Sequence, residues 1–150
     1  MNSNKSRFCL GKEEMLLRDG LFSLPSGNNE KPRLIAGKCV QCGDISFPSK
    51  ERCGKCSSSS IDNILLSNKG KIYTYTIVRQ AFPGYKLPNI VAIVKVPEDD
   101  TLMIISQIKE CDVEEVKIGM EVEMVIDELY TALNGCSVIG YAFKPIKGDQ

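Results

Sequence analysis

Cys39-Val40-Gln41-Cys42-Gly43, together with Cys53-Gly54-Lys55-Cys56, is the stretch that decides the fold. Two Cys-x-x-Cys pairs separated by a short loop are typical of a metal site, because each pair can form a tight turn that directs both sulfur atoms at one ion. Gly43 and Gly54 suit such turns, since glycine tolerates a positive φ. Four thiolates around one tetrahedral ion are the usual structural zinc set, so we expect zinc bound by Cys39, Cys42, Cys53 and Cys56.

Other interpretations of the four cysteines fit the chain less well. Two disulfides would suit a secreted protein, but the N-terminus carries charge without the apolar segment of a secretory signal. A redox dithiol would need a βαβ pattern around a single Cys-x-x-Cys. Iron binds the same tetrahedral sulfur set and stays open as the alternative to zinc. Because the protein fills all four positions, the predicted site is structural and not catalytic.

The chain of 150 residues contains no histidine. This excludes a Ser-His or Cys-His nucleophilic pair within the chain. Three further cysteines, Cys9, Cys111 and Cys136, have no activating motif nearby, and such thiols are usually small buried hydrophobes. Their odd number fits a reducing compartment, and no apolar run reaches the ~18–20 residues of a membrane helix. We therefore expect a cytoplasmic chain that does not act as an enzyme by itself.

Charge is divided unevenly along the chain. Residues 31–96 carry eleven Lys or Arg and three Asp or Glu, whereas residues 97–150 carry four and twelve. This asymmetry favours a basic face that meets an anion or an acidic partner. The alternative is that some of the basic residues only offset the negative charge of a metal tetrathiolate. The four basic residues in question are Lys38, Lys50, Arg52 and Lys55.

The order of elements divides the chain into three parts. Residues 1–33 read as an arm with a short helix over 12–21 and a linker, and residues 34–60 as a zinc ribbon. Residues 61–150 contain five segments typical of strands. These segments are 71–80, 89–96, 102–108, 121–127 and 136–143. With a helical turn near 112–118, they predict a mainly β protein ending in a five-stranded barrel of the oligonucleotide/oligosaccharide-binding (OB) type, with another barrel or sandwich as the alternative.

Several motifs together resemble one known family. In the ribbon they are Gly37-Lys38-Cys39-Val40-Gln41-Cys42-Gly43, Phe47-Pro48 and Cys53-Gly54-Lys55-Cys56. In the barrel they are Lys69-Gly70-Lys71-Ile72-Tyr73 with Thr76, Phe82-Pro83-Gly84-Tyr85, and Ile118-Gly119-Met120-Glu121-Val122. From residue 34 to residue 143 the chain resembles the proteins with a rubredoxin-like zinc ribbon and an OB-fold, formerly called domain of unknown function 35.

This resemblance implies an accessory subunit of an acyl-CoA enzyme. Family members stand beside a thiolase-type subunit that holds the catalytic residues, so no catalytic residue is expected in this chain. The resemblance extends to subunits of thiolases for an aryl 3-oxoacyl-CoA such as benzoylsuccinyl-CoA. We expect the basic and aromatic loop after residue 78 to face the catalytic partner or the phosphates of CoA. The residues chosen for this role are Arg79, Phe82, Gly84, Tyr85 and Lys86.

A module that binds single-stranded nucleic acid is the alternative function. A zinc ribbon and an OB barrel both fit it, and aromatic side chains can stack on bases. Tyr73 and Tyr75 stand two residues apart in a predicted strand and so should share one face. The acidic C-terminal third would repel phosphates, so nucleic acid is not the expected partner.

Overall fold

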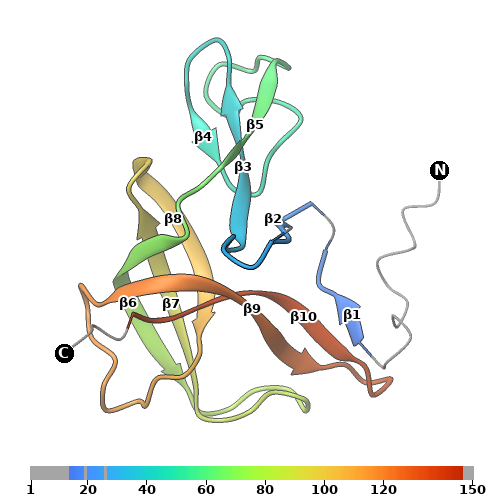
Figure 1. The fold of residues 1–150 in the computed structure, drawn as a ribbon, viewed down its shortest axis with the longest axis vertical. Coiled ribbons are helices and arrows are strands. Elements are labelled where there is room, and N and C mark those ends of the chain that lie inside the picture. The colour runs from blue at the N-terminus through green and yellow to red at the C-terminus, as the bar shows by residue number, and fades with distance from the viewer. Residues whose placement is uncertain (1–13, 19, 26, 147–150) are drawn as a thin grey trace.

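The computed structural model describes residues 14–18, 20–25 and 27–146, and these form ten β-strands and no α-helix. Figure 1 shows a ribbon built from β3, β4 and β5 that projects from a barrel built from β6 to β10. The strands are β1 Glu14–Leu16, β2 Phe22–Ser23, β3 Arg33–Cys39, β4 Ile45–Ser46, β5 Ile61–Leu65, β6 Lys69–Val78, β7 Asn89–Val96, β8 Asp99–Ile108, β9 Glu121–Thr131 and β10 Ser137–Pro145. Within the described residues, no helix is long and apolar enough to span a membrane.

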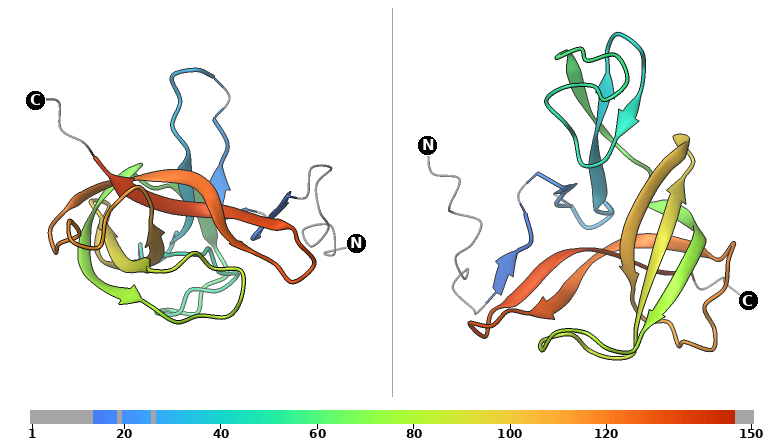
Figure 2. Two further views of the ribbon diagram at one scale, coloured as in Figure 1. Left: turned by 90° about the horizontal axis from the view of Figure 1, so that it is seen from below. Right: turned by 180° about the vertical axis from the view of Figure 1, so that it is seen from behind.

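The barrel is closed by hydrogen bonds between its strands. Its strands follow the order β10-β8-β7-β6-β9, and β9 pairs again with β10. The β8–β10 contact is parallel, through Phe143 and Ile108, and the other pairs are antiparallel. Both views in Figure 2 show these strands curving around one interior. The prediction of a mainly β chain with a five-stranded barrel is therefore confirmed.

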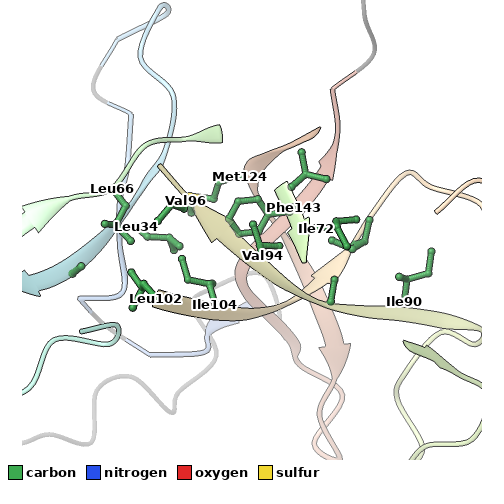
Figure 3. Close-up of a cluster of buried hydrophobic side chains, with 14 of the residues drawn as sticks. Leu34, Leu66, Ile72, Ile90, Val94, Val96, Leu102, Ile104, Met124 and Phe143 are labelled. Carbon is green, nitrogen blue, oxygen red and sulfur yellow. The ribbon is translucent and has the colours of Figure 1, made fainter. Parts of the chain in front are cut away.

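Alternating side chains of the barrel strands form the core. Strand β7 shows this most simply, because every second residue from Ile90 to Val96 is buried. Figure 3 shows Leu34 and Leu66, at the base of the ribbon, next to Val96 and Leu102 of the barrel. These four residues belong to one buried cluster that also contains the fully buried Phe143. The base of the ribbon thus stands on the same core as the barrel.

The two chain segments that connect the ribbon to the barrel lie side by side at the base of the ribbon. Strand β3 pairs with β2, β4 and β5. The N–H of Leu66 donates to the carbonyl oxygen of Leu34 at 2.9 Å. The guanidinium of Arg33 donates to the carbonyl oxygens of Leu65 and Leu66 at 3.0 and 2.7 Å. Higher on the ribbon, the ring of Phe47 meets Tyr141 of β10 edge-on, with centroids 5.4 Å apart.

The short helix predicted over residues 12–21 is not found in the part of that segment the structure describes. Residues Glu14–Leu16 instead form β1, parallel to β10, and the N–H of Leu17 donates to Ile139 at 2.8 Å. A helix this short is marginal by itself, whereas β10 offers backbone partners. Gly140 also makes room, because a Cβ there would lie 3.3 Å from that of Leu17. Residues 12, 13 and 19 lie outside the described residues.

A β-bulge in β6 changes which residues face outward. The pairing of β6 with β7 shifts between Ile72 and Thr74, so Tyr73 is an extra residue in its strand. Tyr73 is 50% exposed, whereas Tyr75 packs against the core. The expectation that Tyr73 and Tyr75 share a face is therefore wrong.

Candidate metal centre and partner-facing loop

The four cysteines of the ribbon converge on one point. Their Sγ atoms all lie within 4.8 Å of one another. Cys39 Sγ and Cys56 Sγ are 3.5 Å apart, as are those of Cys42 and Cys53. A tetrahedral ion with metal–sulfur bonds of about 2.3 Å needs sulfurs about 3.8 Å apart. The cluster fits a tetrahedral metal ion with all four positions filled by sulfur.

Two similar turns position the sulfurs. In the first turn, the N–H of Gly43 donates to the carbonyl oxygen of Cys39 at 2.9 Å, and Gly43 has a φ of 78°. In the second turn, the N–H of Ser57 donates to the carbonyl oxygen of Cys53 at 3.0 Å, and Ser57 has a φ of 64°. The positive φ expected at Gly54 is therefore found three residues later, at Ser57. Each turn places its left-handed residue directly after its second cysteine.

The pKa is lowered at two of the four thiols, Cys39 and Cys53, and raised at the other two, Cys42 and Cys56. The backbone N–H of Cys42 is the main cause that lowers the pKa of Cys39 to about 6. At Cys42 the N–H of Asp44 acts in the same direction, but desolvation and the neighbouring sulfurs prevail and raise the pKa to about 12. A bound cation would be needed to hold all four cysteines as thiolates at this spacing. An all-thiolate tetrahedral set suits zinc or iron.

The cysteines outside the cluster show no sign of an activated nucleophile in the described part of the chain. The thiol of Cys111 is half-buried, and desolvation, followed by Glu115 and Asp112, raises its pKa. A raised pKa disfavours the reactive thiolate. Cys136 is buried and disulfide-bonded, so the expectation that it is a free thiol is wrong. Cys9 lies outside the described residues.

The loop between β6 and β7 is fixed against the end of β9. The N–H of Thr131 donates to the carbonyl oxygen of Gly84 at 2.9 Å. Gly84 has a φ of 111°, and a Cβ there would overlap the carbonyl oxygen of Thr131. The ring of Tyr85 stacks on Tyr130, with centroids 4.9 Å apart and planes at 21°. Both views in Figure 2 show this loop extending on the same side as the β9–β10 hairpin.

The five residues predicted to face a partner or CoA separate into different places. Phe82 and Tyr85 line a groove of about 540 Å³ on the outside of the barrel. Gly84 and Lys86 line a second hollow of about 290 Å³. Arg79 is exposed and lines neither. The structure brings the two aromatic residues together and leaves the two cations apart from them.

Sequence reasoning missed most of the apolar groove. Its wall includes side chains from four barrel strands, namely Val91 of β7, Ile105 of β8, Leu129 of β9 and Tyr141 of β10. Ile105 is 65% exposed and Phe82 is 85% exposed, both high for large apolar side chains. The signal was present in β8, where Leu102-Met103-Ile104-Ile105 is apolar on both faces, although a barrel strand needs only one apolar face.

A relative from Methanocaldococcus jannaschii is a DUF35 domain-containing scaffold protein. It is 38% identical to this chain over 138 residues, which cover 88% of this chain and 96% of the relative. The chain belongs to the DUF35 family. Residues 64–127 of this DUF35 protein also match the family described as ChsH2, C-terminal OB-fold domain. The resemblance inferred from the ribbon and barrel motifs is thus confirmed.

One further relative is a thiolase subunit, and one solved structure shares the fold. The benzoylsuccinyl-CoA thiolase subunit BbsA of Geobacter metallireducens is 30% identical over 115 residues, which cover 77% of this chain and 76% of that subunit. Among solved structures, a chain of the Ltp2-ChsH2(DUF35) aldolase superposes with a TM-score of 0.62 at 22% identity. This match covers 75% of the DUF35 protein described here and 84% of the other chain, and it shows a shared fold.

Proposed function

We propose that this DUF35 protein is a non-catalytic accessory subunit of a thiolase-type acyl-CoA assembly. The observation that carries the proposal is its similarity over most of its length to proteins named as scaffolds and as thiolase subunits. An accessory role also agrees with the chemistry of the chain. It has no histidine to activate a cysteine, and burial disfavours the thiolate of Cys111.

The metal centre has a structural role in this proposal, and zinc is the proposed ion. The four sulfurs leave no open position for water or substrate. Zinc would supply the positive charge that holds the two turns together, and the ribbon would then keep its shape for contact with other subunits. Iron is the alternative ion, and the metal content of the purified protein decides between them.

The catalytic partner is proposed to dock on the β6–β7 loop and the apolar groove beside it. Phe82 and Tyr85 supply aromatic surface of the kind that anchors interfaces. Arg79 and Lys86 stand at the two ends of the same loop and could attract the phosphates of CoA or an acidic patch of the partner. Gly84 holds the loop in place through Thr131.

We also propose a reaction for the assembly in which this chain takes part. The named thiolase relatives favour CoA-dependent cleavage of an aryl 3-oxoacyl-CoA, with benzoylsuccinyl-CoA as the specific candidate. The partner subunit would carry out the bond cleavage. This chain would shape the entrance to the partner's acyl-CoA site in the cytoplasm.

Reconstitution tests the accessory role. The thiolase-type subunit of the same organism is expressed with and without this chain, and 3-oxoacyl-CoA cleavage is measured. We expect a complex on size exclusion and activity that depends on this chain. Absence of a complex, or equal activity without this chain, would contradict the proposal.

Variants of the complex test the proposed surface. Phe82→Ala and Arg79→Glu should weaken assembly or raise the KM for CoA. Leu133→Ala is the matched control, because Leu133 is 96% exposed but does not line the groove. If neither surface variant differs from the control while the complex still forms, the accessory role stands and the chosen surface is wrong.

A further inference from the structure

A hollow of about 390 Å³ lies at the opposite end of β6 from the β6–β7 loop. It collects three lysines from two neighbouring strands, Lys69 and Lys71 of β6 and Lys95 of β7. Strand β6 extends from Lys69 to Val78, so its length separates this hollow from the proposed partner surface. The lysine hollow therefore needs an explanation of its own.

The lysines are placed where they repel one another. Lys71 lies directly opposite Lys95 in the β6–β7 pairing. Like charges directly opposite on neighbouring strands destabilise a sheet. Lys95 is half-buried, and its Nζ lies 4.1 Å from the centroid of the Tyr73 ring.

Carboxylates lie across from two of the lysines, but no lysine of the hollow forms an ion pair within the described residues. The ion pairs there involve Lys31 and Lys144, and none involves a lysine of the hollow. In the β6–β9 pairing Glu121 lies opposite Lys71, and Glu123, which pairs with Lys31 and Lys144, lies opposite Lys69. Asp100 also lines the hollow, and none of these carboxylates comes within ion-pair distance of the three lysines. Among the residues that line the hollow, three ammonium groups and two carboxylates leave a local excess of positive charge.

The remaining walls indicate what kind of anion fits. Pro97 and Ile146 supply the apolar side chains of the hollow, since Val96 is buried in the core, and the volume of the hollow exceeds that of a single phosphate. Lysine binds phosphate as a point charge and does not require a fixed geometry. Glu121 and Asp100 can accept hydrogen bonds from hydroxyl groups, as carboxylates do with ribose.

We propose that this hollow binds an organic diphosphate of the nucleoside diphosphate class. The diphosphate lies between Lys69, Lys71 and Lys95, and the organic part lies against the apolar side. The bound anion removes the repulsion between Lys71 and Lys95. The site is independent of the proposed accessory function, because it uses a different part of the barrel.

Calorimetry of the full chain tests the site, with ADP, inorganic pyrophosphate and adenosine as probes. We expect ADP to bind with a dissociation constant at or below about 1 mM. Pyrophosphate should bind more weakly, and adenosine should give no binding. Added salt should weaken the binding of ADP, because exposed charges are screened. Absence of ADP binding, or adenosine binding as tight as ADP, would overturn the proposal.

Charge-removing variants assign the binding to these residues. Lys71→Gln and Lys95→Gln should each weaken ADP binding about tenfold or more, the usual effect of losing a hydrogen bond to a charged group. Lys117→Gln is the matched control, since Lys117 is an exposed lysine that does not line the hollow. An equal effect in the control and in both site variants would overturn the assignment.

A thermal readout separates binding from folding. Without ADP, Lys71→Gln should unfold at nearly the same temperature as the unsubstituted chain, because the substitution removes both the like-charge contact with Lys95 and the opposite-charge contact with Glu121. With ADP, the unsubstituted chain should gain more thermal stability than Lys71→Gln, because the variant binds ADP more weakly. Equal stabilisation of both chains by ADP would contradict the site.

Discussion

The ribbon and the barrel are both made of β-strands, but they bury different groups. The barrel encloses apolar side chains such as Ile72, Ile104 and Phe143, and each of its strands pairs with two others. The far end of the ribbon has a two-residue strand, β4, and its buried groups there include the thiols of Cys39 and Cys53. A short segment cannot bury enough apolar surface to fold by itself. Dependence on the metal should therefore be confined to the far end of the ribbon, and the barrel should fold without it.

Loss of the metal gives the largest expected effect. Cys39→Ala should abolish stoichiometric metal binding, because structural zinc sites contribute roughly 10–16 kcal/mol of apparent binding energy to local folding. Hydrogen exchange should become fast at residues 39–60 and stay slow in β6 to β10. Metal analysis and exchange mass spectrometry measure both. Cys111→Ala is the control and should keep its metal; full metal content in Cys39→Ala would refute the four-cysteine site.

A cavity in the barrel core should destabilise the barrel, whereas loss of the metal should destabilise only the ribbon. Phe143 is fully buried, so Phe143→Ala should lower the free energy of unfolding by about 3–5 kcal/mol. Urea unfolding followed by circular dichroism measures this change. Phe82→Ala, at an 85% exposed position, should change the free energy by less than about 0.5 kcal/mol. Similar losses in both variants would mean that the barrel core is not the main source of stability.

Gly84→Ala tests the link between the β6–β7 loop and β9. The added Cβ would overlap the carbonyl oxygen of Thr131, and the φ of 111° strains any other residue. We expect a loss of about 1–3 kcal/mol in thermal unfolding, the usual cost of a strained backbone position. Gly27→Ala is the control, because a Cβ at Gly27 has no neighbour within 4 Å. Equal melting temperatures for the two variants would show that the loop is not fixed by this contact.

The smallest expected effect is a stabilisation of the second metal turn. Ser57 has a φ of 64°, a conformation that glycine adopts without strain. Ser57→Gly should therefore stabilise the turn by about 1 kcal/mol and slow metal release to a chelator. Ser59→Gly should have the reverse effect, because Ser59 has no positive φ and glycine only adds freedom to the unfolded chain. Faster release from Ser57→Gly would show that the strain lies elsewhere.

The barrel strands and the metal ligands could be predicted because their signals are local. The β-branched run that predicts a strand over residues 71–80 overlaps most of β6, and the spacing of four cysteines identifies their cluster. The short N-terminal helix is not found in the described part of residues 12–21, where β1 pairs with β10, more than a hundred residues away in the sequence. The bulge at Tyr73 and the left-handed Ser57 depend on geometry that residue type does not encode. The groove and the lysine hollow join strands that are neighbours only in the closed barrel.

The adjacent ends of the ribbon have a consequence for how this protein can be rebuilt. Leu34 and Leu66 are joined by a backbone hydrogen bond, and Arg33 bridges to the same returning chain. The span between them can therefore be exchanged for a tight hairpin turn without rerouting the remaining polypeptide. Such a chimera would be a metal-independent barrel with the same outer surfaces. The ribbon of a related protein could be joined at the same two positions. The complexes that such hybrids form would show whether the ribbon or the barrel determines which partner is bound.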